Sequence, residues 1–275
     1  MIIIQIRRPL LIILVFVIAI SFIITNNTKN NEEINDKIIT IQGIVKGKIE
    51  KKRYNQYKVG VFLINDYTKN KNLKIGQKVN ITGKFKSLDK MKYDDFDYGR
   101  YIKSTGYKGI VYINNYKIID KNKFYSLIGE IKFYISKTYR YLYKKNSDFI
   151  NSILLAEVEN LSEEQKEIFT RTGTSHVISI SGLHTGILCI IISFLLRGIN
   201  KLYKLLILSI FITLYCIMVG ASPSIIRSIA FVMIFYLSIF IDRKKDGISA
   251  LSLIGIILIM NNPYVIYNVS FQLSF

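Results

Sequence analysis

The feature that most constrains this chain is a set of long apolar runs near its two ends. The first run extends from Pro9 to Ile24. The others lie at about residues 175–196, 203–220, 224–241 and 247–260, and a sixth begins near Val265. A helix that crosses a bilayer needs about 20 predominantly apolar residues. The runs therefore predict a multi-span α-helical membrane protein.

The first run has a second interpretation, because a cleaved signal peptide also begins with an apolar segment. No pair of small residues typical of a cleavage site follows it, since the next residues are Thr25, Asn26 and Asn27. We therefore expect residues 1–25 to form a retained transmembrane helix.

Basic residues between the runs predict an orientation. The connections at 197–204 and 242–246 are basic, whereas the other two short connections carry no charge. Basic loops tend to stay in the cytoplasm. Arg7 and Arg8 likewise place the N-terminus in the cytoplasm. We expect a multi-pass protein of the bacterial cytoplasmic (inner) membrane, with residues from about 26 to 174 on the extracytoplasmic side.

The net charge of +19 fits this division of the chain. Residues 25–170 carry 28 basic and 17 acidic side chains, so most of the excess lies in the extracytoplasmic part. A chain rich in Ile, Lys, Asn and Tyr is also what an AT-rich genome encodes. The charge therefore permits a polyanionic partner without identifying one.

Residues 37–120 show the alternation of a small extracytoplasmic β domain. Strands are predicted at 38–45, 57–64, 78–85 and 109–113. Gly43 and Gly83 fall inside strands, where glycine marks bulges or sharp coiling. Four or five short strands suit a small closed β-barrel of the OB-like kind.

An OB-like barrel binds single strands when aromatic side chains accompany a basic groove. The candidate stacking residues are Tyr54, Tyr57, Phe62, Tyr67, Tyr93, Phe96, Tyr98 and Tyr101. The alternative is that these rings fill the barrel core and the lysines only solvate its surface. The sequence leaves both interpretations open.

Residues 121–172 are predicted to form amphipathic or interfacial helices. Apolar and aromatic residues recur at helical spacing over 123–145, with Lys132, Lys137 and Arg140 between them. Such a helix lies in the membrane interface or guides a polyanion. A second helix is expected from a cap at Ser147-Asp148 to about residue 159. A third is expected from a capping box at Ser162 and Gln165 to about Arg171.

The start of the second apolar run carries an unusual group of polar and small residues. They are His176, Ser179, Ser181, Gly182 and His184. Polar groups within lipid are costly unless they face a partner or a watery cavity. Three interpretations remain: a metal site from both histidines, an intramembrane serine hydrolase, or a non-catalytic pore or packing role. Neither the metal site nor the serine hydrolase has the residue spacing that its chemistry needs. We therefore expect no cofactor, no metal and no enzymatic activity.

Three further polar positions lie in the later runs. Ser222 and Pro223 belong to a tight turn in which Pro223 starts the next helix. Arg227 lies one turn inside that helix, where it either snorkels to the interface or faces a passage and meets phosphates. Gln272 is another polar insertion.

In these segments the chain resembles the ComEC family of bacterial competence proteins. The resemblance is carried by Thr172 to His176 with Ser179 to His184, by Tyr215, by Gly220 to Ser224 with Arg227, by Asn262-Pro263 and by Phe271 to Phe275. Upstream, Leu154-Leu155 with Leu161 to Glu164 resembles the family's lead-in, and Phe96 to Tyr98, Arg100 to Ile102 and Gly106 resemble its N-terminal domain. Lys92 to Asp95 and Leu155 to Glu157 depart from the usual pattern. The resemblance covers about residues 38–275.

The resemblance implies a channel component that passes single-stranded DNA across the cytoplasmic membrane during natural transformation. Residues 173–275 would then be an incomplete competence-type transmembrane channel domain. Candidate channel-lining residues are His176, Ser179, Ser181, Gly182, His184, Ser222, Pro223, Arg227 and Gln272. Candidate DNA contacts are Tyr98, Arg100, Lys132, Lys137 and Arg140.

The implied partners are single-stranded DNA, membrane lipid and other competence proteins, including a separate DNA receptor and a separate ATPase. A homo-oligomer is a further expectation. The chain contains no Gly-x-x-x-x-Gly-Lys motif that would make it the motor. The alternative functions are a truncated membrane-anchored scaffold or remnant without transport, and an intramembrane hydrolase.

Overall fold

A computed structural model describes residues 8–28, 34–51, 53–69, 72–89, 91–93, 96–174, 182–220, 223–240, 246–273 and 275. The chain divides into two compact units. Unit 1 comprises Met1–Thr28, Ile180–Ile217 and Ala221–Phe275, and unit 2 comprises Lys29–Ser179 and Met218–Gly220.

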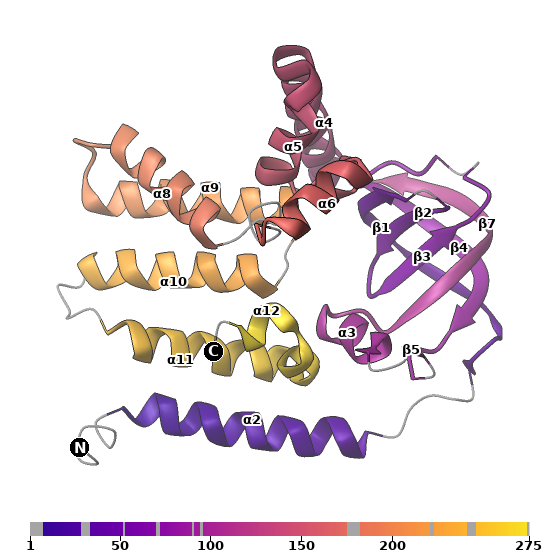
Figure 1. Ribbon diagram of the computed structural model, residues 1–275, viewed down its shortest axis with the longest axis horizontal. Helices are drawn as coiled ribbons and strands as arrows, with labels where there is room; N and C mark the ends of the chain where they lie inside the picture. The colour runs from indigo at the N-terminus through magenta and orange to yellow at the C-terminus, as the bar shows by residue number, and fades with distance from the viewer. Residues whose placement is uncertain are drawn as a thin grey trace. The chain divides into compact units, whose positions relative to one another are not determined.

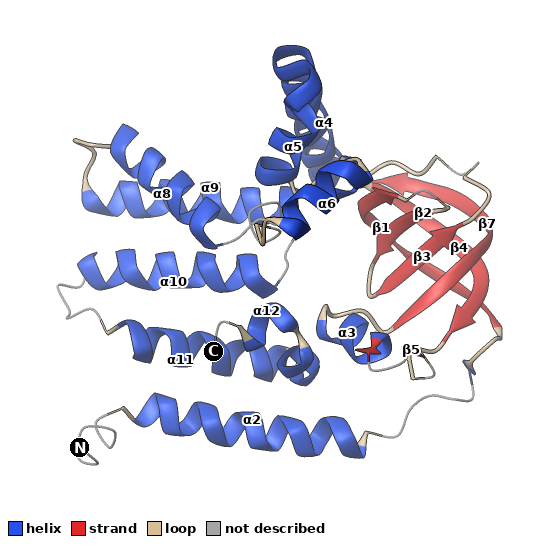
Figure 2. Ribbon diagram, viewed as in Figure 1, coloured by secondary structure: helices blue, strands red, loops and turns tan. Residues whose placement is uncertain are grey.

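Unit 2 contains a closed β-barrel of five strands in the order β1-β2-β3-β7-β4 (Figures 1 and 2). The strands are β1 (Ile38–Glu50), β2 (Asn55–Val59), β3 (Phe62–Asp66), β4 (Gln77–Lys86) and β7 (Gly109–Lys121). β3 and β7 are parallel, and the other neighbours are antiparallel. The predicted small closed barrel is confirmed, while its assignment as an OB-fold remains a prediction.

Alternate residues of each strand fill the barrel, because successive side chains of a strand point to opposite faces. The fully buried members of this core include Val45, Tyr57, Ile64, Val79 and Ile81. Tyr57 is therefore a core residue, as the alternative interpretation of the aromatic residues expected. Between β4 and β7 the chain forms a small hairpin, β5 (Lys92–Tyr93) and β6 (Phe96–Asp97), and the helix α3 (Tyr98–Ser104).

Two glycines shape the strands of the barrel, one against the prediction and one in agreement with it. The single strand predicted at 57–64 is wrong, because the chain turns at Gly60 and Val61 and forms the hairpin β2–β3. Gly60 has φ of +58°, a left-handed conformation that glycine adopts without strain. Gly83 lies at a register shift between β4 and β7, so the predicted bulge there is confirmed.

The helices of unit 2 follow the barrel. They are α4 (Lys123–Tyr143), η2 (Lys144–Asn146), α5 (Ser147–Leu155), η3 (Val158–Asn160) and α6 (Glu163–Arg171). The capping box of α6 is confirmed: Ser162 Oγ accepts from the Gln165 N–H at 3.2 Å, and Gln165 Oε1 accepts from the Ser162 N–H at 3.0 Å. The predicted cap of α5 is wrong. Asn146 takes the N-cap position and makes no side-chain cap hydrogen bond.

The second helix is also shorter than predicted. It ends at Leu155 because Ala156 adopts a left-handed conformation with φ of +57°, and η3 follows as a separate turn. The chain between α4 and α6 is therefore compact. Phe149 of α5 stacks on Phe169 of α6, with ring centroids 5.4 Å apart.

Unit 1 is a set of apolar helices. They are α2 (Pro9–Asn27), α8 (Gly182–Leu195), α9 (Lys201–Val219), α10 (Pro223–Phe240), α11 (Gly247–Asn261), η4 (Pro263–Tyr267) and α12 (Val269–Gln272) (Figure 1). α11 packs against α2 and α10, and α10 also packs against α8 and α12. The core between α2, α11 and α12 includes Leu14, Ile254 and Phe271.

Two helices of the described residues, α2 and α9, are long and apolar enough to cross a membrane by length and composition. Only 17% of the apolar window of α2 and 22% of that of α9 is buried inside the protein. Large apolar side chains such as Phe16 and Ile210 are instead exposed. This much exposed apolar surface is what a helix in contact with lipid presents. The sixth apolar run forms η4 and α12, two short helices that meet at Asn268.

Candidate functional site

Three aromatic side chains form a row on the barrel, at the ends of neighbouring strands. Tyr54 precedes β2, Tyr67 follows β3, and Tyr112 lies in β7. Their ring centroids are 4.9 Å apart for Tyr54 and Tyr67 and 5.9 Å apart for Tyr67 and Tyr112. Lys51 Nζ lies 5.2 Å from the centroid of the Tyr54 ring. Tyr67 is 56% exposed, so its ring surface is open to solvent, whereas Tyr54, Tyr112 and Lys51 are half-buried.

The aromatic row has the chemistry of a base-stacking platform, because unpaired bases stack on aromatic rings next to basic side chains. Tyr54 and Tyr67 were among the stacking candidates from the sequence. Tyr112 and Lys51 were missed. The strand pairing that sets Asn65 of β3 opposite Tyr112 is needed to find Tyr112 beside Tyr67, and sequence spacing contains no sign of it.

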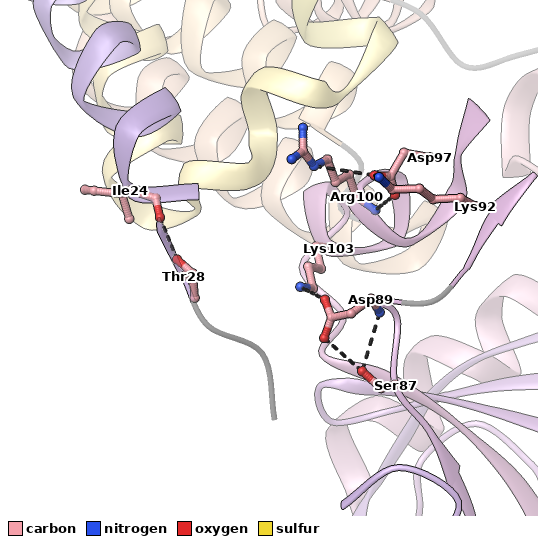
Figure 3. Close-up of polar contacts among 8 residues, drawn as sticks. All are labelled: Ile24, Thr28, Ser87, Asp89, Lys92, Asp97, Arg100 and Lys103. Carbon is pink, nitrogen blue, oxygen red and sulfur yellow. Dashed lines mark hydrogen bonds and ion pairs between the residues drawn. The ribbon is translucent and has the colours of Figure 1, made fainter. Parts of the chain in front are cut away.

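The Phe-Asp-Tyr segment makes several contacts within the α3 region (Figure 3). Asp97 Oδ1 accepts from the Arg100 N–H at 2.9 Å and so caps α3. Its other oxygen lies 3.4 Å from Arg100 Nε and 3.9 Å from Lys92 Nζ. The Tyr98 ring packs beside Tyr101, with centroids 6.3 Å apart. The predicted DNA contacts Tyr98 and Arg100 therefore both have intramolecular partners in the α3 segment.

A second set of polar contacts connects α3 with the segment that follows β4. Lys103 pairs with Asp89, and Ser87 Oγ donates to the second carboxylate oxygen of Asp89 at 2.9 Å (Figure 3). Asp89 and Lys103 are both largely shielded from solvent. The polar residues around α3 thus satisfy one another, which indicates a structural role for this segment.

The helix α4 carries the other three predicted DNA contacts. Lys137 and Arg140 are exposed, and they lie among exposed apolar and aromatic side chains of the same helix, including Phe133, Tyr134 and Tyr141. This mixture fits either of the predicted roles of the helix, in the membrane interface or beside a polyanion. Lys132 differs from both because it is half-buried.

Lys132 belongs to a polar cluster that spans three elements. Ser136, one turn further along α4, donates from Oγ to Glu157 Oε2 at 3.1 Å. Asn160 of η3 donates to the same oxygen at 3.0 Å. Burial lowers the pKa of Lys132, the nearby Glu157 carboxylate opposes this change, and the charge of Lys58 in β2 adds to it. Lys58, itself half-buried, was missed by sequence reasoning.

In unit 1 the structure joins two of the polar segments singled out in the sequence. Arg227 of α10 donates from Nη1 to the backbone oxygen of Ser270 in α12 at 3.2 Å. Gln272 donates from Nε2 to the backbone oxygen of Ile266 at 2.9 Å. An arginine within an apolar helix needs such acceptors, because an unpaired charge in lipid is costly. His184 and Pro223 lie in α8 and at the start of α10, and Gly182 begins α8.

Four of the predicted residues, His176, Ser179, Ser181 and Ser222, lie outside the described residues. The proposals made for them remain predictions. Among the residues that are described, no group of three or more His, Cys, Asp or Glu side chains is arranged to hold a metal ion.

Two polar residues of α2 were missed by sequence reasoning. Ser21 Oγ donates to the backbone oxygen of Pro263 at 2.7 Å, and Thr25 Oγ1 lies 2.9 Å from Tyr267 Oη. Both side chains are buried within unit 1. The signal was present, because two polar residues four apart in an otherwise apolar helix lie on one face.

Comparison with known proteins gives a family for the second half of the chain. Residues 153–275 match the family described as "Competence protein". "ComE operon protein 3" of Bacillus subtilis (strain 168) is 26% identical over 153 residues, which cover 55% of this chain and 20% of that protein. A protein of Aquifex aeolicus (strain VF5) with the name "Uncharacterized protein" is 29% identical over 117 residues, 42% of this chain and 28% of that protein.

This chain therefore spans about a fifth of the Bacillus protein and little more than a quarter of the Aquifex protein. Among solved structures, an aspartyl tRNA synthetase from Entamoeba histolytica aligns with 67% of this chain and 42% of its own chain, at 10% identity and a TM-score of 0.24. A score this low supports no conclusion about fold or function.

Proposed function

We propose that this chain, which belongs to the ComEC family of competence proteins, forms part of a channel that moves single-stranded DNA across the cytoplasmic membrane. The family predicted from the sequence is confirmed by the match over residues 153–275 and by the Bacillus relative. The role in transport, the substrate and the partners are inferences from that membership.

The observation that supports the proposal best is the pairing of Arg227 with the α12 segment. Both lie inside the region that matches the family, and both belong to the polar insertions of otherwise apolar runs. Within the described part of the chain, Arg227 Nη1 donates to the backbone oxygen of Ser270. Because a guanidinium has five N–H donors, this bond leaves capacity for a phosphate of a passing strand.

Two contacts within unit 1 support the proposed orientation. Arg8, at the start of α2, lies 3.8 Å from Asp246, which caps α11. Both residues flank segments that are expected in the cytoplasm. At the other end of α2, Thr25 meets Tyr267, which follows the connection expected outside. Each pair thus joins segments that the charge pattern assigns to the same side of the membrane.

The test replaces Arg227 in cells that take up DNA through this protein. We expect Arg227→Ala to lower entry of labelled DNA into the cytoplasm by about tenfold or more, since a charge-assisted contact to phosphate contributes about 1.5–3 kcal/mol. Arg227→Lys should retain part of the uptake, because it keeps the charge but loses the bidentate geometry. The measurement is nuclease-resistant label inside the cell, normalised to the amount of protein in the membrane fraction.

The matched control is Thr213→Val in α9, which removes an exposed hydroxyl that bonds only within its own helix, to Ser209 O at 2.7 Å. Its uptake should equal that of the wild type. If Arg227→Ala takes up DNA normally and is present in the membrane fraction at the wild-type amount, Arg227 does not contact the strand and has only a snorkelling or packing role. We propose no enzymatic step for this chain. We therefore expect the wild type and Ser181→Ala to show the same background level in an assay of peptide cleavage.

A further inference from the structure

The helix α4 presents a long apolar surface to solvent. Its exposed apolar and aromatic side chains recur at spacings of three, four and seven residues, which places them on one face of a helix. They are Phe124, Leu127, Ile131, Tyr134, Tyr141 and Leu142, called here the apolar face of α4. Tyr134 is 72% exposed and Tyr141 is 81% exposed. An exposed apolar surface of this extent marks a site of interaction with a protein or a membrane.

Contacts on the other side of α4 hold this face outward. A Cβ added at Gly129 would lie 3.0 Å from Ile75 Cβ, so the backbone of α4 lies close against the turn before β4. Further along the helix, Ser136 Oγ donates to Glu157 Oε2 at 3.1 Å. The helix also packs against α5. A rotation that buried the apolar face within unit 2 would break these contacts.

Basic side chains border the apolar face of α4. Lys137 lies three residues after Tyr134 and four before Tyr141, and Arg140 and Lys144 follow Lys137 at spacings of three and four residues. All three cations are exposed. Within the described residues, no carboxylate pairs with any of them.

The acidic content of this stretch is low. Glu130 is the only acidic residue from 123 to 145 in the sequence, and its carboxylate lies 3.2 Å from Lys121 Nζ. The exposed side of α4 therefore combines an apolar face with a positively charged edge. This charge is complementary to a negatively charged surface.

An anionic phospholipid surface matches both parts of this pattern. A helix with an apolar face and basic edges lies in the interface plane, with its apolar side chains among the acyl chains and its cations at the headgroups. Tyrosine is enriched at this depth because its ring is apolar and its hydroxyl is polar.

Two other occupants fit the pattern less well. A second copy of the helix would bring two positively charged edges together. A nucleic acid strand would pair with the cations and stack on the tyrosines, but it would leave the aliphatic side chains of Leu127, Ile131 and Leu142 in water. Only the lipid surface covers the aliphatic part of the face and also balances its charge.

The chain keeps unit 2 within reach of a bilayer. The helix α2, which is long and apolar enough to cross a membrane, ends at Asn27, and β1 begins at Ile38. Only residues 28–37 separate the two elements, and an extended chain spans at most about 3.5 Å per residue. A bilayer that holds α2 is therefore available to unit 2.

We propose that α4 is a membrane-docking helix, which inserts its apolar face into the headgroup region of a bilayer and prefers anionic phospholipid. The cations at its edge bind the lipid phosphates. The proposal is independent of DNA transport, since it concerns the surface on which unit 2 rests and not the cargo.

The test uses the absence of tryptophan from the chain, which makes any introduced tryptophan the only one. The full chain with Tyr134→Trp is placed in phosphatidylglycerol nanodiscs, in which part of the lipid carries a nitroxide quencher on the upper acyl chain. We expect the tryptophan emission to shift to shorter wavelength and to be quenched by the labelled lipid.

Two matched controls report on other exposed positions. Phe133→Trp lies on the same helix, but its side chain points about 100° away from that of residue 134, so it should be quenched less. Ile119→Trp lies at an exposed position of β7 and should keep the emission of a water-exposed tryptophan, with little quenching.

Further substitutions in the Tyr134→Trp chain separate the two parts of the face. Leu127→Ser with Ile131→Ser should lower the quenching to the level of Ile119→Trp. Lys137→Gln and Arg140→Gln should each lower the ratio of docked to undocked helix roughly fivefold in phosphatidylglycerol and have little effect in phosphatidylcholine. All four positions are exposed, so the denaturation curve of each variant should match that of its parent.

Three results would overturn the inference. The first is quenching of Tyr134→Trp no stronger than that of Ile119→Trp in anionic nanodiscs. The second is emission that is shifted but insensitive to the labelled lipid, which would assign the face to a second copy or another protein. The third is emission that responds to oligo(dT) and not to the labelled lipid, which would assign the face to a nucleic acid strand.

Discussion

Single residues of unit 2 hold positive charge where water reaches poorly. Burial lowers the pKa of Lys58. Burial also lowers the pKa of Lys132, with Glu157 acting against the change and Lys58 adding to it. A lysine whose pKa is lowered holds its proton less tightly in the folded protein than in the unfolded chain. Between the lowered pKa and the ordinary value of 10.5 the unfolded state binds more protons, so folding stability rises with pH.

We therefore expect the wild type to gain stability, relative to the Lys58→Met/Lys132→Met variant, as the pH rises through the lowered pKa values toward the ordinary value of 10.5. Buried tyrosines act in the opposite direction only at higher pH. Burial raises the pKa of Tyr107 to about 12, so its contribution is lost as the pH rises above 10.0. The measurement is thermal unfolding of both proteins across this pH series in the absence of DNA. Parallel curves would show that Lys58 and Lys132 are not desolvated.

The element that best illustrates local design is α3 with the short hairpin before it. Asp97 caps the helix by accepting a hydrogen bond from the Arg100 N–H. Gly99, in the first turn of α3, is buried against the turn that follows β4. A Cβ at Gly99 would lie 1.9 Å from the backbone oxygen of Leu88. The backbone of that turn cannot move aside as a flexible side chain would. The close approach therefore requires glycine.

We expect Gly99→Ala to destabilise unit 2 by about 1–3 kcal/mol, the usual cost of forcing extra volume into a packed site. The matched control is Gly186→Ala in α8, where no atom lies within 4 Å of the new Cβ. That variant should be neutral or slightly stabilising, because alanine favours helix over glycine. Chemical denaturation of the purified chain measures both. Equal stability of Gly99→Ala and the wild type would contradict the packing described for α3.

The same elements show which parts of the fold were accessible from sequence. The capping box of α6 and the bulge at Gly83 depend on local chemistry, and both are confirmed. The apolar runs were visible for the same reason, and α2, α9, α10 and α11 lie within a few residues of them. The hairpin β2–β3 was not predicted, because the residues on both sides of Gly60 form one continuous β-like pattern in the sequence.

The candidate site was less accessible because its residues come together only through tertiary structure. The influence of Lys58 on the pKa of Lys132 depends on tertiary structure that no spacing rule covers. Gly47 leaves room for the stem of Lys58 only through the register of β1 with β2. Tyr112 joins the aromatic row through a parallel strand pair. The ion pair of Arg100 with Asp97 also depends on the folded α3 segment, and a DNA contact at Arg100 stays a prediction.

At the scale of the whole molecule, the two units differ in the surface that they present. Unit 1 exposes large apolar side chains along α2 and α9, and unit 2 presents most of its lysines to water. Two polar contacts of unit 1 join residues at the ends of α2 to later segments, Arg8 with Asp246 and Thr25 with Tyr267.

The most direct test of a role in DNA entry removes this protein from the organism that encodes it. Labelled duplex DNA is supplied to the deletion strain, and label bound at the surface is separated from nuclease-resistant label in the cytoplasm. We predict normal surface binding and loss of cytoplasmic label, with recovery when the intact gene is returned. Cytoplasmic label equal to that of the parent strain would contradict a transport role for this chain.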